Sequence, residues 1–192
     1  MAGTQVFGFK EHVLWQWDHE SALVRRFVNR VTGDLTDGEL NWQSVPGVHS
    51  IWHQVWHMFL SLDHYFSHAF AIKSCWDDGG WASRMDLSGM QQAFDYPGLV
   101  YDYLPRFTIC EVPDTLVDEL RAPPLADFLK YVDGMLARCR SVLEKASEED
   151  LCTEFFAYGR MAPRVTAARF EHVYRHLGMM EFTRGLIRGP GG

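Results

Sequence analysis

The 192-residue sequence has few cysteines and no run of basic residues, and each shortage narrows the possible functions. Its four cysteines are widely spaced and form no C-x-x-C pair, so we expect reduced thiols rather than a zinc ribbon or a redox pair. Lysine and arginine number 18 against 25 acidic residues, which gives a formal net charge of −7. This balance argues against nucleic acid or an anionic membrane as the general partner.

Long apolar stretches are also missing. No run approaches the roughly 18 residues of a membrane-spanning helix, because charges or histidines interrupt every candidate. The start of the chain, M-A-G-T-Q-V-F-G-F-K, lacks the basic and apolar stretches of a signal peptide, so we expect a cytoplasmic protein without a membrane partner. Hydrophobic residues nevertheless make up 47% of the chain. This length and composition predict one globular domain over residues 1–192.

Four segments have helical periodicity. Apolar residues repeat at helical spacing over residues 9–32, and a second run covers 49–73 before D-D-G-G. A third helix is predicted from Pro123-Pro124 to about residue 146. The fourth is expected to use Thr166 as its N-cap and to continue to about residue 188. These segments predict an all-α protein, a four-helix bundle with a long elaborated connection between helices two and three.

That connection, residues 74–122, is rich in Gly, Pro and Asp and is too long for an ordinary helix connection. It is predicted to form a long crossover, short helices or a flap, and the sequence assigns no role to its W-D-D-G-G-W and F-D-Y-P-G-L-V-Y-D-Y-L-P stretches. Two further stretches, T-D-G-E-L (36–40) and S-E-E-D-L (147–151), each place a hydroxyl residue three positions before an acid. Both are expected to form short capped turns.

The histidines carry the clearest chemical signal. Five of the nine lie in H-S-I-W-H-Q-V-W-H-M-F-L-S-L-D-H-Y-F-S-H, residues 49–68. Histidines four apart lie on one helix face, about 6 Å apart along the axis, which suits a shared metal ion. Random placement would give roughly 0.4 such pairs, whereas the chain has four: 49/53, 53/57, 64/68 and 172/176. The last pair is the most specific, because it lies far from the other histidines.

His172 and His176 lie close to the apolar Val173 and Leu177, so their rings are expected to point inward. Two histidines without partners are unfavourable in a core, and a shared metal ion would remove that penalty. Gly178 is expected to leave room for a helix or ligand to approach. The alternative is that carboxylates, or the two rings themselves, satisfy both histidines by hydrogen bonds.

Helix geometry limits how many of the five clustered histidines reach one ion. All share one side of their helix, but His53 and His64 lie about 6 and about 10.5 Å from His57 along the axis. Metal–nitrogen bonds are about 2 Å long, so this helix offers one histidine or an adjacent pair. A parallel neighbour would place His57 beside the 172/176 pair, and an antiparallel one would shift the level toward His64. Geometry alone leaves that choice open.

Four stretches together resemble the DinB-like family of metalloenzymes. They are L-T-D-G-E-L-N-W, P-G-V-H-S-I-W-H-Q-V-W-H, S-V-L-E-K-A-S-E-E-D-L and H-V-Y-R-H-L-G-M-M-E-F-T-R-G-L, in an order that covers most of the chain. The family has one metal-binding histidine about seven residues after a Ser-Ile pair and two more as H-x-x-x-H followed by x-G. The resemblance implies that His57, His172 and His176 bind the metal, with His53 and His64 as alternatives to the first.

The resemblance also implies a helical bundle, a long second connection and a homodimer. Three neutral imidazoles leave a divalent metal with open positions, and the sequence does not choose among zinc, nickel, iron and manganese. Some family members are thiol-dependent S-transferases or a mycothiol-dependent isomerase. We therefore expect a metal-dependent transferase or hydrolase acting on a small molecule, with a low-molecular-weight thiol as a candidate cosubstrate. A non-catalytic metal-binding or ligand-binding dimer is the alternative.

Other residues near the expected site have weaker signals, and none is assigned as catalytic. Glu171 and Glu181 are candidate bases or hydrogen-bond acceptors, although solvated surface carboxylates are the simpler interpretation. Arg184 is a candidate to meet an anionic substrate or an internal acid. His49 is expected at the helix entrance, and His68 at an exposed or interhelical position.

Overall fold

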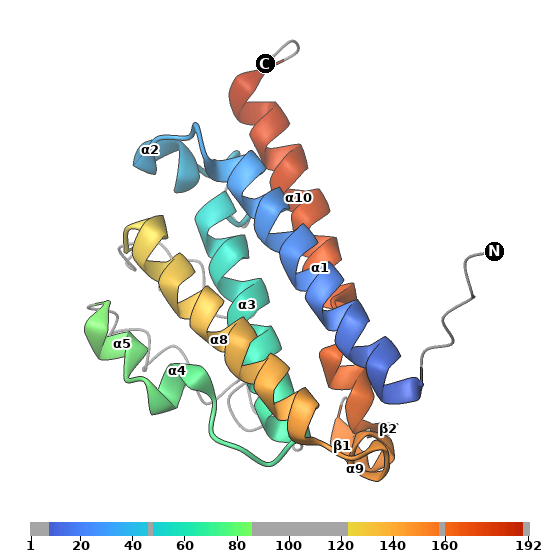
Figure 1. Ribbon diagram of the computed structural model, residues 1–192. Helices are drawn as coiled ribbons and strands as arrows, with labels where there is room; N and C mark the ends of the chain where they lie inside the picture. Colours follow the sequence, from blue (N-terminus) through green and yellow to red (C-terminus); the bar gives the residue numbers. More distant parts are fainter. Residues whose placement is uncertain (1–7, 46–47, 86–122, 158–159, 190–192) are drawn as a thin grey trace, which may run out of the picture.

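The computed structural model describes residues 8–45, 48–85, 123–157 and 160–189. Four long helices pack into a bundle (Figure 1): α1 (Phe9–Thr32), α3 (Ile51–Ala69), α8 (Leu125–Lys145) and α10 (Glu171–Arg188). The shorter elements are α2 (Asp37–Leu40), α4 (Cys75–Asp78), α5 (Trp81–Arg84), α9 (Glu148–Cys152), β1 (Glu154–Ala157), β2 (Arg160–Pro163) and the 3₁₀ helix η2 (Arg164–Ala168). The predicted all-α bundle is confirmed, with one small hairpin added.

Helix α3 is the centre of the bundle. Every residue from 51 to 60 is buried, and the helix contacts α8, α10 and η2. By contrast, α1 buries one stripe of residues: Val13, Trp17, Val24, Val28, Val31 and Thr32. A helix buried on nearly all sides carries its polar residues into the interior. Among the described residues, no helix is long and apolar enough to span a bilayer.

The predicted boundaries hold for α1 and for the end of α10. Helix α3 ends at Ala69, earlier than the predicted residue 73. The reason is Ala71, whose φ of 52° lies in the left-handed region and cannot continue a right-handed helix. Ser74 then caps α4, so D-D-G-G closes this short helix and not the long one. The third predicted helix begins at Leu125, with Pro124 as its N-cap.

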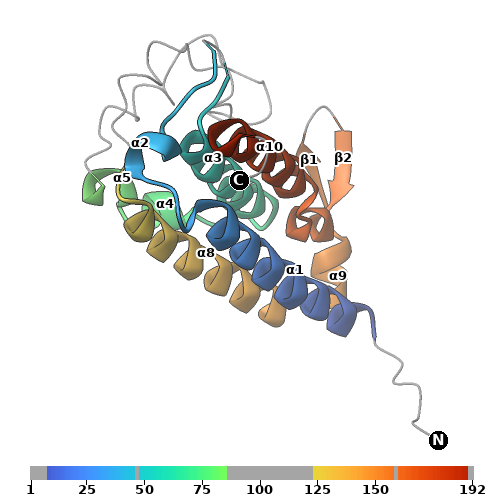
Figure 2. The same cartoon turned by 90° about the horizontal axis from the view of Figure 1, so that it is seen from above.

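The predicted start of the fourth helix is wrong. Thr166 lies inside η2, where its hydroxyl donates to the carbonyl of Pro163 at 2.7 Å, and α10 begins at Glu171. The preceding residues form the antiparallel hairpin, in which Glu154 pairs with Pro163. Strands of four residues are too short to show a clear period-two pattern, so the sequence did not reveal them. The hairpin and η2 lie beside the start of α10 (Figure 2).

Both predicted capped turns are confirmed. The Thr36 hydroxyl accepts the Glu39 backbone N–H, and the Glu39 carboxylate accepts the Thr36 backbone N–H at 2.8 Å. Ser147 and Asp150 form the same reciprocal pair at the start of α9. Each turn is specified by four consecutive residues, which is why sequence alone identified it.

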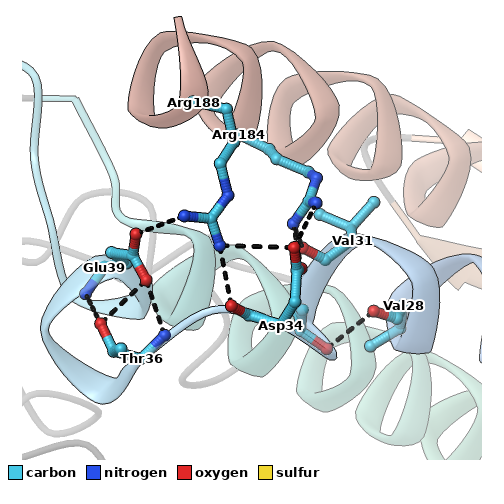
Figure 3. Close-up of polar contacts among 8 residues, drawn as sticks. Val28, Val31, Asp34, Thr36, Glu39, Arg184 and Arg188 are labelled. Carbon is cyan, nitrogen blue, oxygen red and sulfur yellow. Dashed lines mark hydrogen bonds and ion pairs between the residues drawn. The ribbon is translucent and has the colours of Figure 1, made fainter. Parts of the chain in front are cut away.

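Two arginines near the end of α10 bind the corner between α1 and α2 (Figure 3). Arg184 donates to both carboxylate oxygens of Asp34, at 2.6 and 2.9 Å, and to the Val31 carbonyl at 2.8 Å. Arg188 bridges the Glu39 carboxylate and the Asp34 carbonyl, each at 2.7 Å. The hydrogen bond from Arg184 lowers the pKa of Asp34 to about 2. Arg184 therefore pairs with an acid of the chain, but this acid lies at the surface and not in the interior as expected.

A buried carboxylate on α3 fixes the start of the long connection. Asp63 is 1% exposed and accepts the backbone N–H groups of Cys75 and Trp76 at 3.0 and 2.9 Å. It also accepts the Tyr131 hydroxyl of α8 at 2.8 Å, and burial with the nearby carboxylate raises the pKa of that hydroxyl. We call these residues the Asp63 cluster. It joins three helices in the interior.

The W-D-D-G-G-W stretch now has a structural role. Its two tryptophans, Trp76 and Trp81, both place their rings edge-on to Tyr131, at 5.2 and 5.6 Å between centroids. Gly80 between them has a φ of 59°, a conformation that favours glycine. The described part of the connection thus forms short helices, one of the three expected outcomes. The F-D-Y-P-G-L-V-Y-D-Y-L-P stretch lies outside the described residues.

Candidate metal centre

Helices α3 and α10 carry the histidines and run in opposite directions (Figure 1). The Ser50 side chain accepts the N–H of His53, which fixes the start of α3 and places His57 in its second turn. Helix α10 begins at Glu171, so His172 and His176 lie in its first two turns, facing α3. The two helices thus bring together residues more than a hundred positions apart.

His57, His172 and His176 meet at one point. Their ring nitrogens lie within 4.8 Å of one another, and the Nε2 atoms of His57 and His172 are 3.0 Å apart. The three ring centroids are 4.6 to 5.1 Å apart, with edge-to-face contacts. Nitrogens bound to one tetrahedral zinc would be roughly 3.4 Å apart, so the cluster has the size of a single-ion site. It is the only such group of potential ligands among the described residues.

All three rings are held in their neutral form. Burial, followed by the repulsion of neighbouring rings, lowers the pKa of His57 to about 2 and that of His176 to about 4. Burial also lowers the pKa of His172. A neutral imidazole has a nitrogen lone pair for a metal, whereas an imidazolium has none. At neutral pH the cluster therefore presents three potential ligands.

One ring atom in the cluster lacks a hydrogen-bond partner. The Nδ1 atom of His176 is buried and makes no hydrogen bond with any described residue. Leaving a buried polar atom unsatisfied costs about 1–3 kcal/mol. The contact between His57 and His172 satisfies those two rings in part, but no carboxylate accepts from His176 in the described chain. The residues present therefore fit a divalent metal ion bound between the three rings.

A family model described as the DinB superfamily matches residues 22–180. The chain belongs to the DinB superfamily. The crystal structure of a conserved protein from Enterococcus faecalis has a similar fold, with a TM-score of 0.67 and 17% identity. The match covers 96% of this chain and all of that one. No curated protein matches. The resemblance drawn from the sequence motifs is confirmed.

The remaining histidines of this DinB superfamily chain lie outside the three-nitrogen group. His53 is buried and its ring is parallel to those of His49 and His57, at 4.1 and 6.3 Å. Burial lowers the pKa of His53 to about 3 and also lowers that of His64. His68 is exposed, and its Nε2 lies 2.9 Å from the Phe156 carbonyl of β1. The histidine-rich stretch therefore contributes one residue to the cluster.

The expectation that an antiparallel neighbour would select His64 is wrong. It assumed that the fourth helix starts at residue 166 and that the two helices are level at their ends. Instead, the second half of α3 packs against η2 and β1, with His68 bonded to Phe156. The first turns of α10 therefore lie level with His57, in the second turn of α3. The hairpin sets this register, and His57 is the ring that meets the pair.

The other residues singled out near the pair are not part of the cluster. Glu171 and Glu181 are exposed and form surface ion pairs with Arg169 and Arg30, at 3.5 and 2.7 Å. They are solvated carboxylates, which was the simpler interpretation. Gly178 is exposed, and an added Cβ would meet no atom within 4 Å, so no described helix approaches it; its expected role toward a ligand stays a prediction.

Sequence reasoning missed a cavity beside the cluster. Its volume is about 190 Å³, and His172 forms part of its wall. The remaining wall comes from the second half of α3, from β2, and from the residues that lead into α10, including Arg160 and Arg169. No pattern in the sequence places these arginines beside His172, because the unpredicted hairpin and 3₁₀ helix position them.

Proposed function

We propose that His57, His172 and His176 bind one divalent metal ion and that this DinB superfamily protein is a metal-dependent enzyme acting on a small molecule. The supporting observation is the convergence of three neutral imidazoles, two of them buried, with the His176 Nδ1 atom unsatisfied. Zinc, nickel, iron and manganese all accept imidazole nitrogen.

The proposed reaction is a transfer or a hydrolysis, with a low-molecular-weight thiol as cosubstrate in the case of transfer. A metal with three imidazole ligands supplies a Lewis acid with open positions, which lowers the pKa of a bound water or thiol. The chain itself positions the imidazoles and provides a space for the substrate. Packing of α3 holds the His57 ring, burial keeps the imidazoles neutral, and the cavity at His172 admits a small molecule. We assign no general acid or base.

A second candidate is a metal-binding or ligand-binding dimer without catalysis. Helix α10 exposes Met179, Phe182 and Leu186, which are spaced three and four residues apart and share one face. Exposed apolar residues on one helix face suit contact with a second copy of the chain. A homodimer is compatible with both candidates, so catalysis must be tested directly.

The test is metal analysis of the untagged protein beside two matched variants. We expect about one ion per chain in the wild type and in His64→Ala, and less than about a tenth of that in His57→Ala. The His64 variant removes a histidine from the same helix outside the cluster. A wild type without stoichiometric metal, or a His57→Ala protein that retains it, would contradict the proposal.

Catalysis is tested by turnover of an electrophilic substrate with bacillithiol, mycothiol or glutathione. A metal-dependent rate with one of these thiols, lost in His57→Ala, is the expected result for a transferase. Hydrolysis is followed without thiol on ester and amide substrates. Stoichiometric metal with no turnover in either assay would favour the non-catalytic dimer.

A further inference from the structure

The cavity beside His172 has the size of a site for a small ligand. It lies between the second half of α3, the hairpin and the start of α10, which adjoin one another in Figure 2. Its volume of about 190 Å³ is below the about 300–1,000 Å³ typical of drug-sized ligands. Because His172 belongs both to its wall and to the three-histidine cluster, a molecule bound in it lies next to the cluster.

Two arginines line this cavity, and neither is firmly bound to an acid. The Arg160 backbone pairs with Ala157 in the hairpin, but its guanidinium makes no hydrogen bond or ion pair with any described residue. Arg169 lies 3.5 Å from Glu171, with the two side chains 56% and 81% exposed. Such exposed pairs contribute about 0–1 kcal/mol, so this arginine is readily available to a ligand.

Three arginines elsewhere in the described chain are bound more firmly. Arg25, Arg140 and Arg184 each hold a carboxylate at 2.6 to 2.7 Å. By comparison, the guanidinium groups of the two cavity arginines keep most of their hydrogen-bonding capacity for a ligand. Two such cations on the wall of one cavity indicate an anionic ligand.

The other residues of the cavity wall indicate how apolar the ligand is and how many negative charges it carries. Leu62, Ala162 and Val173 give it apolar surface, and the Thr166 hydroxyl already donates to a backbone carbonyl. Glu171 also lines the cavity and would repel a second negative charge. Apolar walls, two cations and one acid fit a ligand with an apolar body and a single negative charge.

We propose that this cavity binds the carboxylate of a small substrate and that Arg160 and Arg169 determine this specificity. A guanidinium presents paired N–H donors that match the two oxygens of a carboxylate. The inference rests on the proposed function, since it assigns a substrate class to the proposed metal-dependent enzyme. The arginines bind and orient the substrate beside His172, and they take no part in bond making.

The experiment measures binding of benzoate, benzamide and phenyl phosphate to the full chain by ligand-observed NMR. Benzoate is expected to bind saturably, and benzamide, which lacks the charge, about tenfold more weakly. Phenyl phosphate is expected to bind more weakly than benzoate because Glu171 repels its second charge. Arg160→Gln should weaken benzoate binding about tenfold, and Arg160→Lys should weaken it less.

Arg169→Gln is also expected to weaken benzoate binding. Arg26→Gln is the matched control. Arg26 is exposed on α1 and does not line the cavity, so its replacement should change benzoate affinity less than about twofold. Equal binding of benzoate and benzamide, or unchanged benzoate binding by both cavity variants, would overturn the inference. Tighter binding of phenyl phosphate would overturn the choice of a carboxylate.

Each titration is repeated on metal-loaded protein and on protein treated with chelator. Arginine-dependent benzoate binding by a chain that holds no stoichiometric metal would support this inference and contradict the proposed function. Stoichiometric metal without arginine-dependent binding would overturn this inference alone. The two failures are thereby distinguished.

Discussion

Helix α3 carries two interior polar clusters, six residues apart, and they differ in how their polar atoms are satisfied. In the Asp63 cluster, both carboxylate oxygens accept hydrogen bonds from inside the chain, at 2.8 to 3.0 Å. In the three-histidine cluster, the rings contact one another and the His176 Nδ1 atom has no partner among the described residues. Burial is similar, since Asp63 is 1% and His57 3% exposed.

This difference separates a structural role from a candidate functional one. A buried polar group that is fully satisfied within the chain positions helices and has no capacity left for a ligand. A buried group left unsatisfied reduces stability unless something else binds to it. On that reasoning the Asp63 cluster serves the fold, and the histidine cluster is the candidate ligand site. Three measurements test this contrast, and a fourth tests an exposed ion pair outside both clusters.

The largest effect is expected from Asp63→Ala. It leaves the N–H groups of Cys75 and Trp76 and the Tyr131 hydroxyl buried without their acceptor, and should lower the free energy of unfolding by about 3–5 kcal/mol. Urea denaturation measures this loss. The metal content of the folded protein should stay at the wild-type level, because Asp63 is not in the histidine cluster. A loss below about 1 kcal/mol would contradict the structural role.

Metal addition is expected to have the next largest effect. An ion present at a hundredfold excess over its Kd stabilises the folded chain by about 2.7 kcal/mol. For a chain of this size, that is an increase in Tm of about 5–10 °C. The wild type and His68→Ala should show the increase, and His172→Ala should not. An equal increase in His172→Ala would mean that the ion binds elsewhere.

A smaller effect, of opposite sign to that of Asp63→Ala, is expected from His176→Leu in metal-free protein. Leucine has a similar volume and removes the unsatisfied Nδ1 atom, so the free energy of unfolding should rise by about 1 kcal/mol. His68→Leu is the control, because it removes a ring that is bonded to the Phe156 carbonyl. If His176→Leu is as destabilising as Asp63→Ala, the histidine cluster is already satisfied within the chain.

The smallest effect is expected at the exposed Arg184–Asp34 pair. The folded-state pKa of Asp34 is lowered from 3.8 to about 2, so its ion pair stabilises the fold above pH 4 and is lost as the pH falls through 2. The difference in urea midpoint between the wild type and Asp34→Asn should be constant from pH 7 to about pH 5. It should then shrink between about pH 4 and pH 2. A constant difference down to pH 2 would contradict the lowered pKa.

Much of the fold was predictable because its signals are local. The periodicity of residues 9–32 requires only neighbouring residues, and so do the capped turns at Thr36 and Ser147. The hairpin was missed because its strands are four residues long. The single domain, the cytoplasmic location and the homodimer stay predictions.

The candidate site, like the fold, has one part that was predictable from the sequence and one part that was not. The sequence by itself determined the chemistry: His172 and His176 one helical turn apart, and a partner from the run of histidines on another helix. The resemblance to the DinB-like family then named His57. Helix geometry alone could not identify His57, because the choice of histidine depends on how α3 and α10 are offset along their axes.

Only the tertiary structure decided that offset. The 3₁₀ helix η2 packs against α3, β1 contacts the second half of α3 at Tyr65 and His68, and the start of α10 lies level with His57. The same elements place Arg160 and Arg169 beside His172 and so create the cavity. The physical reason is that helical periodicity fixes angle and rise within one helix, whereas the packing of elements far apart in sequence fixes which side chains meet.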